Sequence, residues 1–314
     1  MKKVYCIGEL LIDFVAENQG SDLSKAVEFT KKAGGAPANV ACAISKLGGN
    51  SAFIGCVGKD PFGSYLLNIL SEHSVDISLA QRSDIFTTLA FVSLAEDGER
   101  DFVFSRGADK ELKYQSSIKH HFKDSIVHFG AATALLGGNL ENAYSHYYFD
   151  TLTQNSFISF DPNYRSDLWK GRDEVFIKKC RPFIEKAHLC KFSLEEAQLL
   201  TSRDDVRTAC SDLHAMGVHL VAVTLGREGT FVSTSRTQKT VGSIKVKAVD
   251  TTGAGDAFIG CLLQQISTLD HAEDILKDDD KLMDMVAIAN RAGAWTTTNY
   301  GAIESLPDHH QLNL

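Results

Sequence analysis

The sequence predicts an α/β fold with a mostly parallel central sheet, helices on both of its faces and a small separate β element. Two observations carry this prediction. From residue 125 to residue 224, short apolar runs alternate with longer segments of helical periodicity, as expected of strands buried between two layers of helices. Near residues 87–104, two strand-like runs instead flank the polar segment 95–100, which predicts a long hairpin.

The amino-terminal part of the chain predicts three strands and two helices. Pro37 precedes apolar residues at helical spacing, and Gly48-Gly49 closes that pattern. Proline just inside a helix start and glycine just past its end are the usual arrangement. The strands are expected at Val4–Ile7, Leu10–Val15 and Ser51–Val57, and the second helix at Pro61–Ser71.

The rest of the chain repeats strand and helix in turn. Strands are expected at 126–129, 157–160, 189–192 and 220–224, and helices near 140–154, 172–187, 194–201 and 204–216. This order predicts one domain over residues 1–314 with a parallel sheet. Strands from about 10–32 and 87–104 are inserted in it as a small lid. The lid would cover a cleft at the carboxyl ends of the sheet strands, where open α/β sheets bind ligands.

The composition is that of a globular protein that works without nucleic acid or a membrane. The formal net charge of the 314 residues is -8, which disfavours a nucleic-acid or anionic-membrane surface. No run of 18 apolar residues occurs, so no membrane span is expected. The seven cysteines lack CxxC spacing and are expected to be reduced, buried thiols. We expect a cytoplasmic protein, because Glu9 and Asp13 interrupt the apolar start that a signal peptide would need.

The segment Val249–Phe258 carries the strongest chemical signal. Gly253, Ala254 and Gly255 form a glycine-rich turn, after which apolar residues recur at helical spacing. Free amides and the helix dipole make such a helix start an anion site. Asp256 lies in the first turn, where its carboxylate would either accept a proton from an attacking hydroxyl or only cap the helix. The residues by themselves leave both interpretations open.

Two motifs more than 200 residues apart resemble those of the ribokinase-like carbohydrate kinases. Val249–Phe258 is similar to the carboxyl-terminal motif of that family. Gly34-Gly35-Ala36-Pro37-Ala38-Asn39, followed by Leu47-Gly48-Gly49 and Ile54-Gly55-Cys56-Val57-Gly58, is similar to its amino-terminal motif. Segments 8–13, 161–165 and 224–226 fill the interval in order, so the resemblance covers nearly the whole chain. It implies a three-layer α/β/α sandwich with a β-strand lid.

The resemblance also implies a role for each matching position. Asp256 is the implied general base, and the amides of Gly253, Ala254 and Gly255 form the implied anion hole, with Arg165 between sugar and phosphates. The implied sugar-binding residues are Asp13, Gly34, Gly35, Asn39 and Arg106, together with Asp256. The implied nucleotide contacts are Thr224, Gly226, Gly229 and Asn290, with Glu196 near magnesium and phosphate. Asp250 and Thr252 match a monovalent-cation site, which makes K⁺ an additional expected cofactor.

Simpler structural roles compete with these assignments. Asp13 also fits a satisfied structural carboxylate, and Gly34-Gly35 fits an ordinary turn. Arg165 would then pair with Asp167 on the surface, while Asp250 and Thr252 would only cap a turn. The chain departs from the family at Ser193, where many members have asparagine three residues before the glutamate. This departure weakens the support for a Glu196 role.

Several segments resemble the fructokinase branch of the family. They are Gly8-Glu9 with Ile12-Asp13-Phe14, the Gly-Gly-Ala-Pro-Ala-Asn motif, Arg106 with Asp109, Asp161–Arg165, and Leu168-Trp169. The resemblance implies that ATP, with Mg²⁺ bridging its phosphates, phosphorylates the C6 hydroxyl of fructose. Kinases of 2-keto-3-deoxygluconate or of a nucleoside such as aminoimidazole riboside remain alternatives.

The motifs of two other protein classes are missing from the sequence. A dinucleotide-dependent oxidoreductase would need GxGxxG after the first strand, where the chain reads Gly8-Glu9-Leu10-Leu11. A P-loop also fails, because Asp60 follows Gly58-Lys59. A non-catalytic sugar-binding protein of the same fold stays open, although the Gly-Ala-Gly-Asp motif is intact. Aromatic residues of the lid, such as Phe29, Phe91 and Phe104, favour a homodimer formed through the lid.

Overall fold

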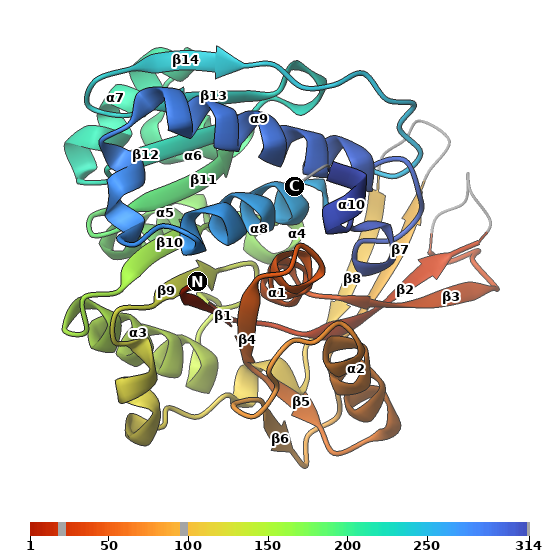
Figure 1. Ribbon diagram of the computed structural model, residues 1–314. Helices are drawn as coiled ribbons and strands as arrows, with labels where there is room; N and C mark the ends of the chain where they lie inside the picture. Colours follow the sequence, from red (N-terminus) through yellow and green to blue (C-terminus); the bar gives the residue numbers. More distant parts are fainter. Residues whose placement is uncertain (18–22, 95–99, 313–314) are drawn as a thin grey trace.

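A computed structural model describes residues 1–17, 23–94 and 100–312. The central sheet has eight strands in the order β14-β13-β12-β11-β10-β9-β1-β4 (Figure 1). They are β1 (Lys3–Ile7), β4 (Asn50–Ile54), β9 (Ile126–Gly130), β10 (Phe157–Asp161), β11 (Leu189–Ser193), β12 (Leu220–Thr224), β13 (Thr230–Ser233) and β14 (Gln238–Val241). All neighbours from β4 to β12 are parallel, and β13 and β14 are antiparallel additions at one edge.

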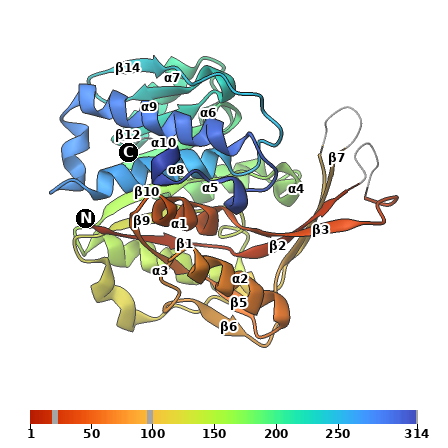
Figure 2. The same cartoon turned by 45° about the vertical axis from the view of Figure 1, so that its right-hand side comes forward.

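Helices cover both faces of this sheet, which gives the predicted three layers (Figure 2). One face carries α1 (Ala36–Lys46), α8 (Ala254–Ser267) and α9 (Asp279–Thr296). The other carries α3 (Gly138–Leu152), α5 (Asp173–Ile184), α6 (Leu194–Thr201) and α7 (Val206–Met216). Side chains alternate between the two faces of the sheet along β1, so the core has two parts. Val4 and Cys6 pack with the first helix layer, and Tyr5 and Ile7 pack with the second. The remaining helices are α2 (Pro61–Glu72), α4 (Ser166–Trp169) and α10 (His309–Leu312).

The lid is a separate four-stranded sheet in the order β3-β2-β7-β8. Its strands are β2 (Leu11–Ala16), β3 (Phe29–Gly34), β7 (Leu89–Leu94) and β8 (Arg100–Ser105), which correspond to the predicted segments near 10–32 and 87–104. In both ribbon views the lid projects from one side of the main body (Figures 1 and 2). The expected hairpin tip at 95–99 lies outside the described residues.

One part of the strand prediction needs correction. The strand expected at Ser51–Val57 is divided into β4 and β5 (Cys56–Gly58), and β5 pairs with β6 (Gln81–Ser83) in a small sheet of its own. The division falls at Gly55, where a Cβ atom would lie 2.5 Å from the carbonyl oxygen of Gly8. The main chains therefore approach too closely there for any other residue.

All seven cysteines are free and buried, as the composition predicts. Asp278 caps α9 by accepting a hydrogen bond from the amide of Lys281. Within the part of the chain that the structure describes, no helix combines the length and the apolar character that crossing a membrane requires.

Candidate active site

The two motif segments meet because α1 and α8 pack side by side on one face of the sheet. Nδ2 of Asn39, in the first turn of α1, donates a hydrogen bond of 2.8 Å to Oδ2 of Asp256, in the first turn of α8. Both side chains are buried, with exposed fractions of 5% and 8%. Oδ1 of Asn39 is buried without a hydrogen-bond partner among the described residues. A buried acceptor of this kind fits a ligand that brings a hydroxyl group.

The turn before Asp256 has the backbone geometry of an anion site. Gly253 is the N-cap of α8 in the left-handed region, at φ 78°, and no side chain caps the helix. The amide of Ala254 donates to the carbonyl of Thr251 at 3.3 Å. Among the described residues, the amides of Gly253, Gly255 and Asp256 have no acceptor in the chain. These unpaired donors at a helix start can receive an anion.

The environment of Asp256 raises the pKa of its carboxyl group above the ordinary value. Burial is the main cause, and the nearby charge of Asp161 acts in the same direction. The hydrogen bond from Asn39 and the charges of Lys191 and Arg165 oppose the shift. A carboxylate with a raised pKa is a stronger base than an exposed aspartate, as proton abstraction requires.

The amino-terminal glycines bring the lid against the start of α1. A Cβ atom on Gly34 would lie 2.0 Å from Oδ2 of Asp13, so the Asp13 carboxyl group of β2 rests directly on the backbone of β3. A Cβ atom on Gly35, at φ 113°, would lie 2.5 Å from the carbonyl oxygen of Glu9. Glycine is therefore needed at both positions, so that Asp13 and the Glu9 carbonyl can lie against the backbone. The turn formed by Gly34 and Gly35 leads directly into the helix that carries Asn39.

Glu9 is a site residue to which the resemblance assigned no role. It is 1% exposed, and its Oε1 accepts a hydrogen bond of 3.1 Å from the amide of Ala36 at the start of α1. Burial raises the pKa of Glu9 to about 7, and Asp109 acts in the same direction, while Arg165 and two backbone hydrogen bonds oppose it. Glu9 thus holds the helix start through a carboxyl group that titrates near neutrality.

Arg106 and Asp109 form an ion pair at the base of the lid. Nη2 of Arg106 lies 3.0 Å from Oδ2 of Asp109, whose side chain is completely buried. Thr88 donates to the other Asp109 oxygen and accepts from the amide of Gly107 at 2.9 Å. The Arg106–Asp109 ion pair and the contacts of Thr88 therefore connect β7 and β8 to the main body. The ion pair also fixes the position of the Arg106 guanidinium group.

Arg165 lies at the edge of the site and is exposed. Its Nη1 donates to the carbonyl of Tyr164 at 3.1 Å, and its charge lowers the pKa of both Glu9 and Asp256. The alternative partner Asp167 instead pairs with Lys170 at 3.1 Å. The structure thus brings the Arg165 charge near the general-base candidate.

Glu196 serves a local structural purpose at the start of α6. Its two carboxylate oxygens accept hydrogen bonds of 2.7 Å from the amides of Tyr164 and Ser193. Oγ of Ser193 in turn accepts a hydrogen bond of 3.1 Å from the amide of Glu196, which completes a capping box. The serine at this family position therefore caps the helix, and Glu196 links the loops that follow β10 and β11.

The implied nucleotide contacts lie in two places. Thr224, Gly226 and Gly229 lie at and after the carboxyl end of β12, and Asn290 lies beside β13. Gly226 (φ 58°) and Gly229 (φ 99°) shape a tight loop after Thr224, closed by a hydrogen bond of 2.8 Å from Leu225 to the Gly229 carbonyl. A Cβ atom on Gly229 would lie 2.1 Å from the carbonyl oxygen of Val241. Asn290 of α9 accepts from Thr230 at 2.6 Å and donates to Val241 at 2.8 Å. Its amide group thus joins α9 to the antiparallel strands.

The side chains of Asp250 and Thr252 lie in contact with each other. Oδ1 of Asp250 accepts from both the amide and the hydroxyl of Thr252, at 2.9 and 2.6 Å. Oδ2 of Asp250 accepts from the amide of Gly301 at 3.0 Å. These bonds fit the turn-capping alternative, and they fasten the anion turn to the loop at residues 299–301.

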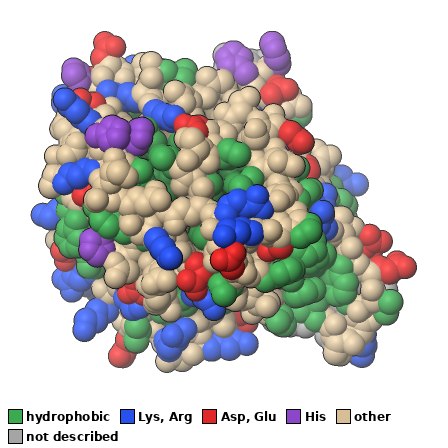
Figure 3. All heavy atoms as spheres, turned by 90° about the horizontal axis from the view of Figure 1, so that it is seen from below, with side chains coloured by type: hydrophobic (Ala, Val, Ile, Leu, Met, Phe, Trp, Pro, Cys, Tyr) green, Lys and Arg blue, Asp and Glu red, His purple; other side chains and the backbone are tan. Residues whose placement is uncertain are grey.

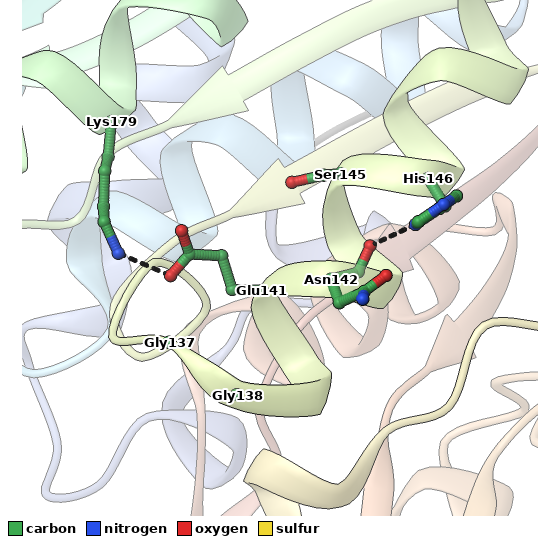
Figure 4. A pocket seen from close by; sticks show the side chains of 7 residues that line it. All are labelled: Gly137, Gly138, Glu141, Asn142, Ser145, His146 and Lys179. Atoms are coloured by element: carbon green, nitrogen blue, oxygen red, sulfur yellow. Dashed lines mark hydrogen bonds and ion pairs between the residues drawn. The ribbon is translucent and has the colours of Figure 1, made fainter.

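A separate cavity lies away from this constellation, at the start of α3 (Figure 4). Its volume is about 450 Å³, and Lys179 of α5 pairs with Glu141 across it at 2.6 Å. His146 bonds back to the carbonyl of Asn142 within the same helix. None of the sequence-predicted site residues lines this cavity.

Comparison with known proteins decides the family. The model of the "pfkB family carbohydrate kinase" matches residues 1–309. This chain belongs to the pfkB family of carbohydrate kinases. Within the family it is similar to "Probable fructokinase-5" of Arabidopsis thaliana, with 39% identity over 312 residues that cover 97% of this chain and 94% of that protein.

Solved structures agree with this pfkB assignment. A fructokinase with bound ATP from Xylella fastidiosa superposes with a TM-score of 0.86 at 28% identity, covering 99% of this chain and 97% of that one. A double mutant of the fructokinase from Vibrio cholerae O395, in a form with fructose, ADP and potassium ion bound, also gives a TM-score of 0.86, at 30% identity. That match covers 100% of this chain and 97% of the Vibrio chain. The predicted ribokinase-like fold is therefore confirmed.

Proposed function

We propose that this pfkB kinase is an ATP-dependent fructokinase that converts ATP and D-fructose to ADP and D-fructose 6-phosphate. One observation carries the chemistry: Asp256, held by its hydrogen bond from Asn39, is a buried carboxylate beside the unpaired amides of Gly253, Gly255 and Asp256. A base and an anion site thus lie next to each other. The similarity to fructokinases over almost the whole chain supports fructose as the acceptor.

Asp256 is the proposed general base. The primary hydroxyl of fructose would lie against its carboxylate, which accepts the proton as the hydroxyl oxygen attacks the γ-phosphorus in line with the leaving ADP oxygen. The amides of the 253–256 turn would stabilise the charge that develops on the phosphoryl oxygens. Such catalysis consists mainly of positioning and electrostatic stabilisation.

Sugar recognition is proposed for the surface between lid and body. Asp13 and the unpartnered Oδ1 of Asn39 supply acceptors for sugar hydroxyls, and Arg106, held by Asp109, supplies donors. The backbone of Gly34 and Gly35 would let the sugar approach closely. ATP would extend from the anion turn towards Thr224, Gly226 and Gly229, with Arg165 between the two substrates.

Divalent metal is proposed to arrive with the nucleotide. In the part of the chain that the structure describes, no group of three or more His, Cys, Asp or Glu side chains is arranged to hold a metal ion. Mg²⁺ commonly keeps several waters and binds substrate phosphates, so this donor set fits an ion held mainly by ATP. Glu196, whose oxygens already accept two backbone amides, would contribute indirectly by fixing the neighbouring loops.

A monovalent cation beside the anion turn is also proposed. Asp250, Thr252 and the carbonyls of the adjoining loop offer the hard oxygen atoms that such an ion requires, and the Vibrio cholerae relative was solved with potassium ion bound. Bound K⁺ would order the turn and add positive charge near the phosphates.

A homodimer through the lid remains a proposal. β3 and β8 are the two edges of the lid sheet, and edge strands offer unpaired backbone groups. Ile85, Phe86 and Val103 are large apolar residues exposed in this part of the chain, and Figure 3 shows apolar side chains gathered on the side where the lid lies. Sedimentation analysis of the protein and of Val103→Glu tests this. A monomer in both cases would contradict the proposal.

The decisive experiment is a substrate panel with ADP release as the measurement. We expect kcat/KM to be highest for fructose among fructose, ribose, 2-keto-3-deoxygluconate and aminoimidazole riboside. A rival that wins by about tenfold, roughly 1.4 kcal/mol of transition-state discrimination, would overturn the choice of sugar. Sugar binding without ADP release from any substrate would favour the non-catalytic alternative.

A further inference from the structure

Lys191 of β11 is a buried cation that none of the roles above uses. Its side chain is 9% exposed, and its Nζ donates a hydrogen bond of 3.1 Å to Oδ2 of Asp161, whose side chain is 1% exposed. The other Asp161 oxygen accepts from the amide of Asn163 at 3.1 Å. Within the described residues, Asp161 is the single acceptor that Lys191 reaches. An ammonium group has three N–H donors, so two of them remain for a ligand.

The Lys191 ammonium group lies directly against the anion turn. A Cβ atom on Gly255 would lie 3.1 Å from Nζ and 3.4 Å from Cε of Lys191. The hydrogen bond to Asp161 holds Nζ in place, so a side chain at position 255 would crowd the ammonium group. Glycine at position 255 thus leaves room for a full positive charge beside the unpaired amide.

The charges around this cation are mainly negative. Burial alone would lower the pKa of Lys191, but the carboxylates of Asp161, Glu196 and Asp256 outweigh it and raise the pKa above its ordinary value. Lys191 is therefore charged throughout the range in which an enzyme works. A polyphosphate entering a protein of net charge -8 meets further repulsion from these carboxylates. A fixed cation beside the γ-phosphoryl group would offset that repulsion at the point where the group is transferred.

We propose that Lys191 is a further catalytic residue, whose Nζ binds a non-bridging oxygen of the γ-phosphoryl group during its transfer. The proposal rests on the proposed kinase reaction. The bond between the γ-phosphorus and the bridging oxygen breaks, that oxygen leaves with ADP, and a bond to the sugar oxygen forms. The sugar proton goes to Asp256, while Lys191 keeps its proton and stabilises the phosphoryl oxygens. Asp161 positions Lys191.

The competing explanation is that Lys191 only neutralises buried Asp161. Lys191→Met removes the cation but leaves that carboxylate unpaired, which can destabilise the fold. The double variant Lys191→Met/Asp161→Asn removes both charges of this ion pair, so Asp161 is not left as an unpaired carboxylate. Lys179→Met is the matched control, because Lys179 also pairs with a carboxylate, that of Glu141, in the separate α3–α5 cavity.

The test combines turnover with nucleotide binding. We expect kcat with fructose to fall by roughly 10²–10³-fold in the double variant, as on loss of an oxyanion donor, and to stay normal in the Lys179→Met control. The Kd for ADP should change by less than about twofold, while the Kd for the non-hydrolysable analogue AMP-PNP should rise about tenfold, because only the analogue carries a γ-phosphoryl group.

Near-normal kcat and an unchanged AMP-PNP affinity in the double variant would overturn the proposal and leave Lys191 as the partner of Asp161. The measurements of ADP and AMP-PNP binding do not depend on which sugar the enzyme phosphorylates. If the wild-type protein turned over another sugar or none, the fructokinase assignment would fail. The ratio of the two Kd values would still decide the role of Lys191.

Discussion

The side chain of Asn39 donates a hydrogen bond of 2.8 Å to the carboxylate of Asp256, although 217 positions separate the two residues in the sequence. The bond joins the first turns of α1 and α8, so it fixes one helix start relative to the other. It leaves Asn39 Oδ1 as a buried acceptor beside the anion turn. One amide group thus orients the proposed base and marks where a sugar hydroxyl would bind.

Replacing Asp256 with Asn should lower turnover strongly while preserving the site. An amide cannot accept the proton, and loss of a positioned base typically costs roughly 10²–10⁴-fold in rate. We expect the Kd values of ATP and fructose to change little, because shape and volume are retained. Turnover by ADP release and binding by calorimetry check this. A variant with near-normal kcat would show that Asp256 only caps the helix.

Replacing Asn39 with Ala should move the acid limb of the pH–rate profile. The hydrogen bond from Asn39 lowers the pKa of Asp256, against burial and the charge of Asp161, which raise it. Without that bond the pKa rises further, and the base is then protonated at a higher pH. We expect activity to be lost earlier as the pH falls, and the sugar KM to increase.

The profile of kcat/KM against pH checks this prediction, with Asn142→Ala, at an exposed position of α3, as the control. An acid limb at the wild-type position in Asn39→Ala would mean that another group sets it.

The sequence contains most of the fold because local signals and global packing agree. Residues 194–201 were expected to be helical, and the Ser193–Glu196 capping box fixes that helix start. β13 and β14 escaped prediction, because each is only four residues long and mixes polar with apolar residues. Pairing with β12 defines β13, and pairing with β13 defines the edge strand β14. An edge strand carries little hydrophobic pattern of its own.

Only the site residues that belong to recognised motifs could be assigned a role from the sequence. The resemblance placed Asn39 and Asp256 together, and their hydrogen bond agrees with that placement. Glu9 lies in a segment of the resemblance but received no role, and Lys191 received none either, because their partners Ala36 and Asp161 are brought near by tertiary structure alone. Charged residues in otherwise apolar strands were the one available indication, since a buried charge needs a partner.

Glu9 predicts a pH dependence of stability. Its pKa in the folded protein is about 7, well above that of an unfolded glutamate, so the folded state binds more protons between these two values. The contribution of Glu9 to stability is therefore complete below the unfolded pKa and is lost as the pH rises through about 7. Glu9→Gln keeps an acceptor for the Ala36 amide but cannot ionise.

Denaturant unfolding of both proteins from pH 5 to pH 8 measures this effect, with pH values chosen to bracket the shift. We expect the stability of Glu9→Gln relative to wild type to increase as the pH rises. A constant difference across the range would mean that Glu9 does not titrate there.

The final prediction concerns a monovalent cation at Asp250. The Asp250 carboxylate binds the amide and hydroxyl of Thr252 and the amide of Gly301, so it organises the turn that supplies the anion site. If the ion serves catalysis, activity should rise when K⁺ replaces a bulky organic cation at constant ionic strength. Asp250→Ala should remove that response, and Thr252→Val should weaken it by deleting one oxygen ligand.

The turn-cap and cation-site interpretations predict different activities for the variants in different salts. A turn held only by hydrogen bonds would make the enzyme equally active without any alkali cation, and Asp250→Ala would then lower activity by the same factor in every salt. A cation site instead makes the loss specific to K⁺, because the variant and the wild type converge in the organic salt. Titrating K⁺ against initial rate for wild type and both variants separates a cation ligand from a turn cap.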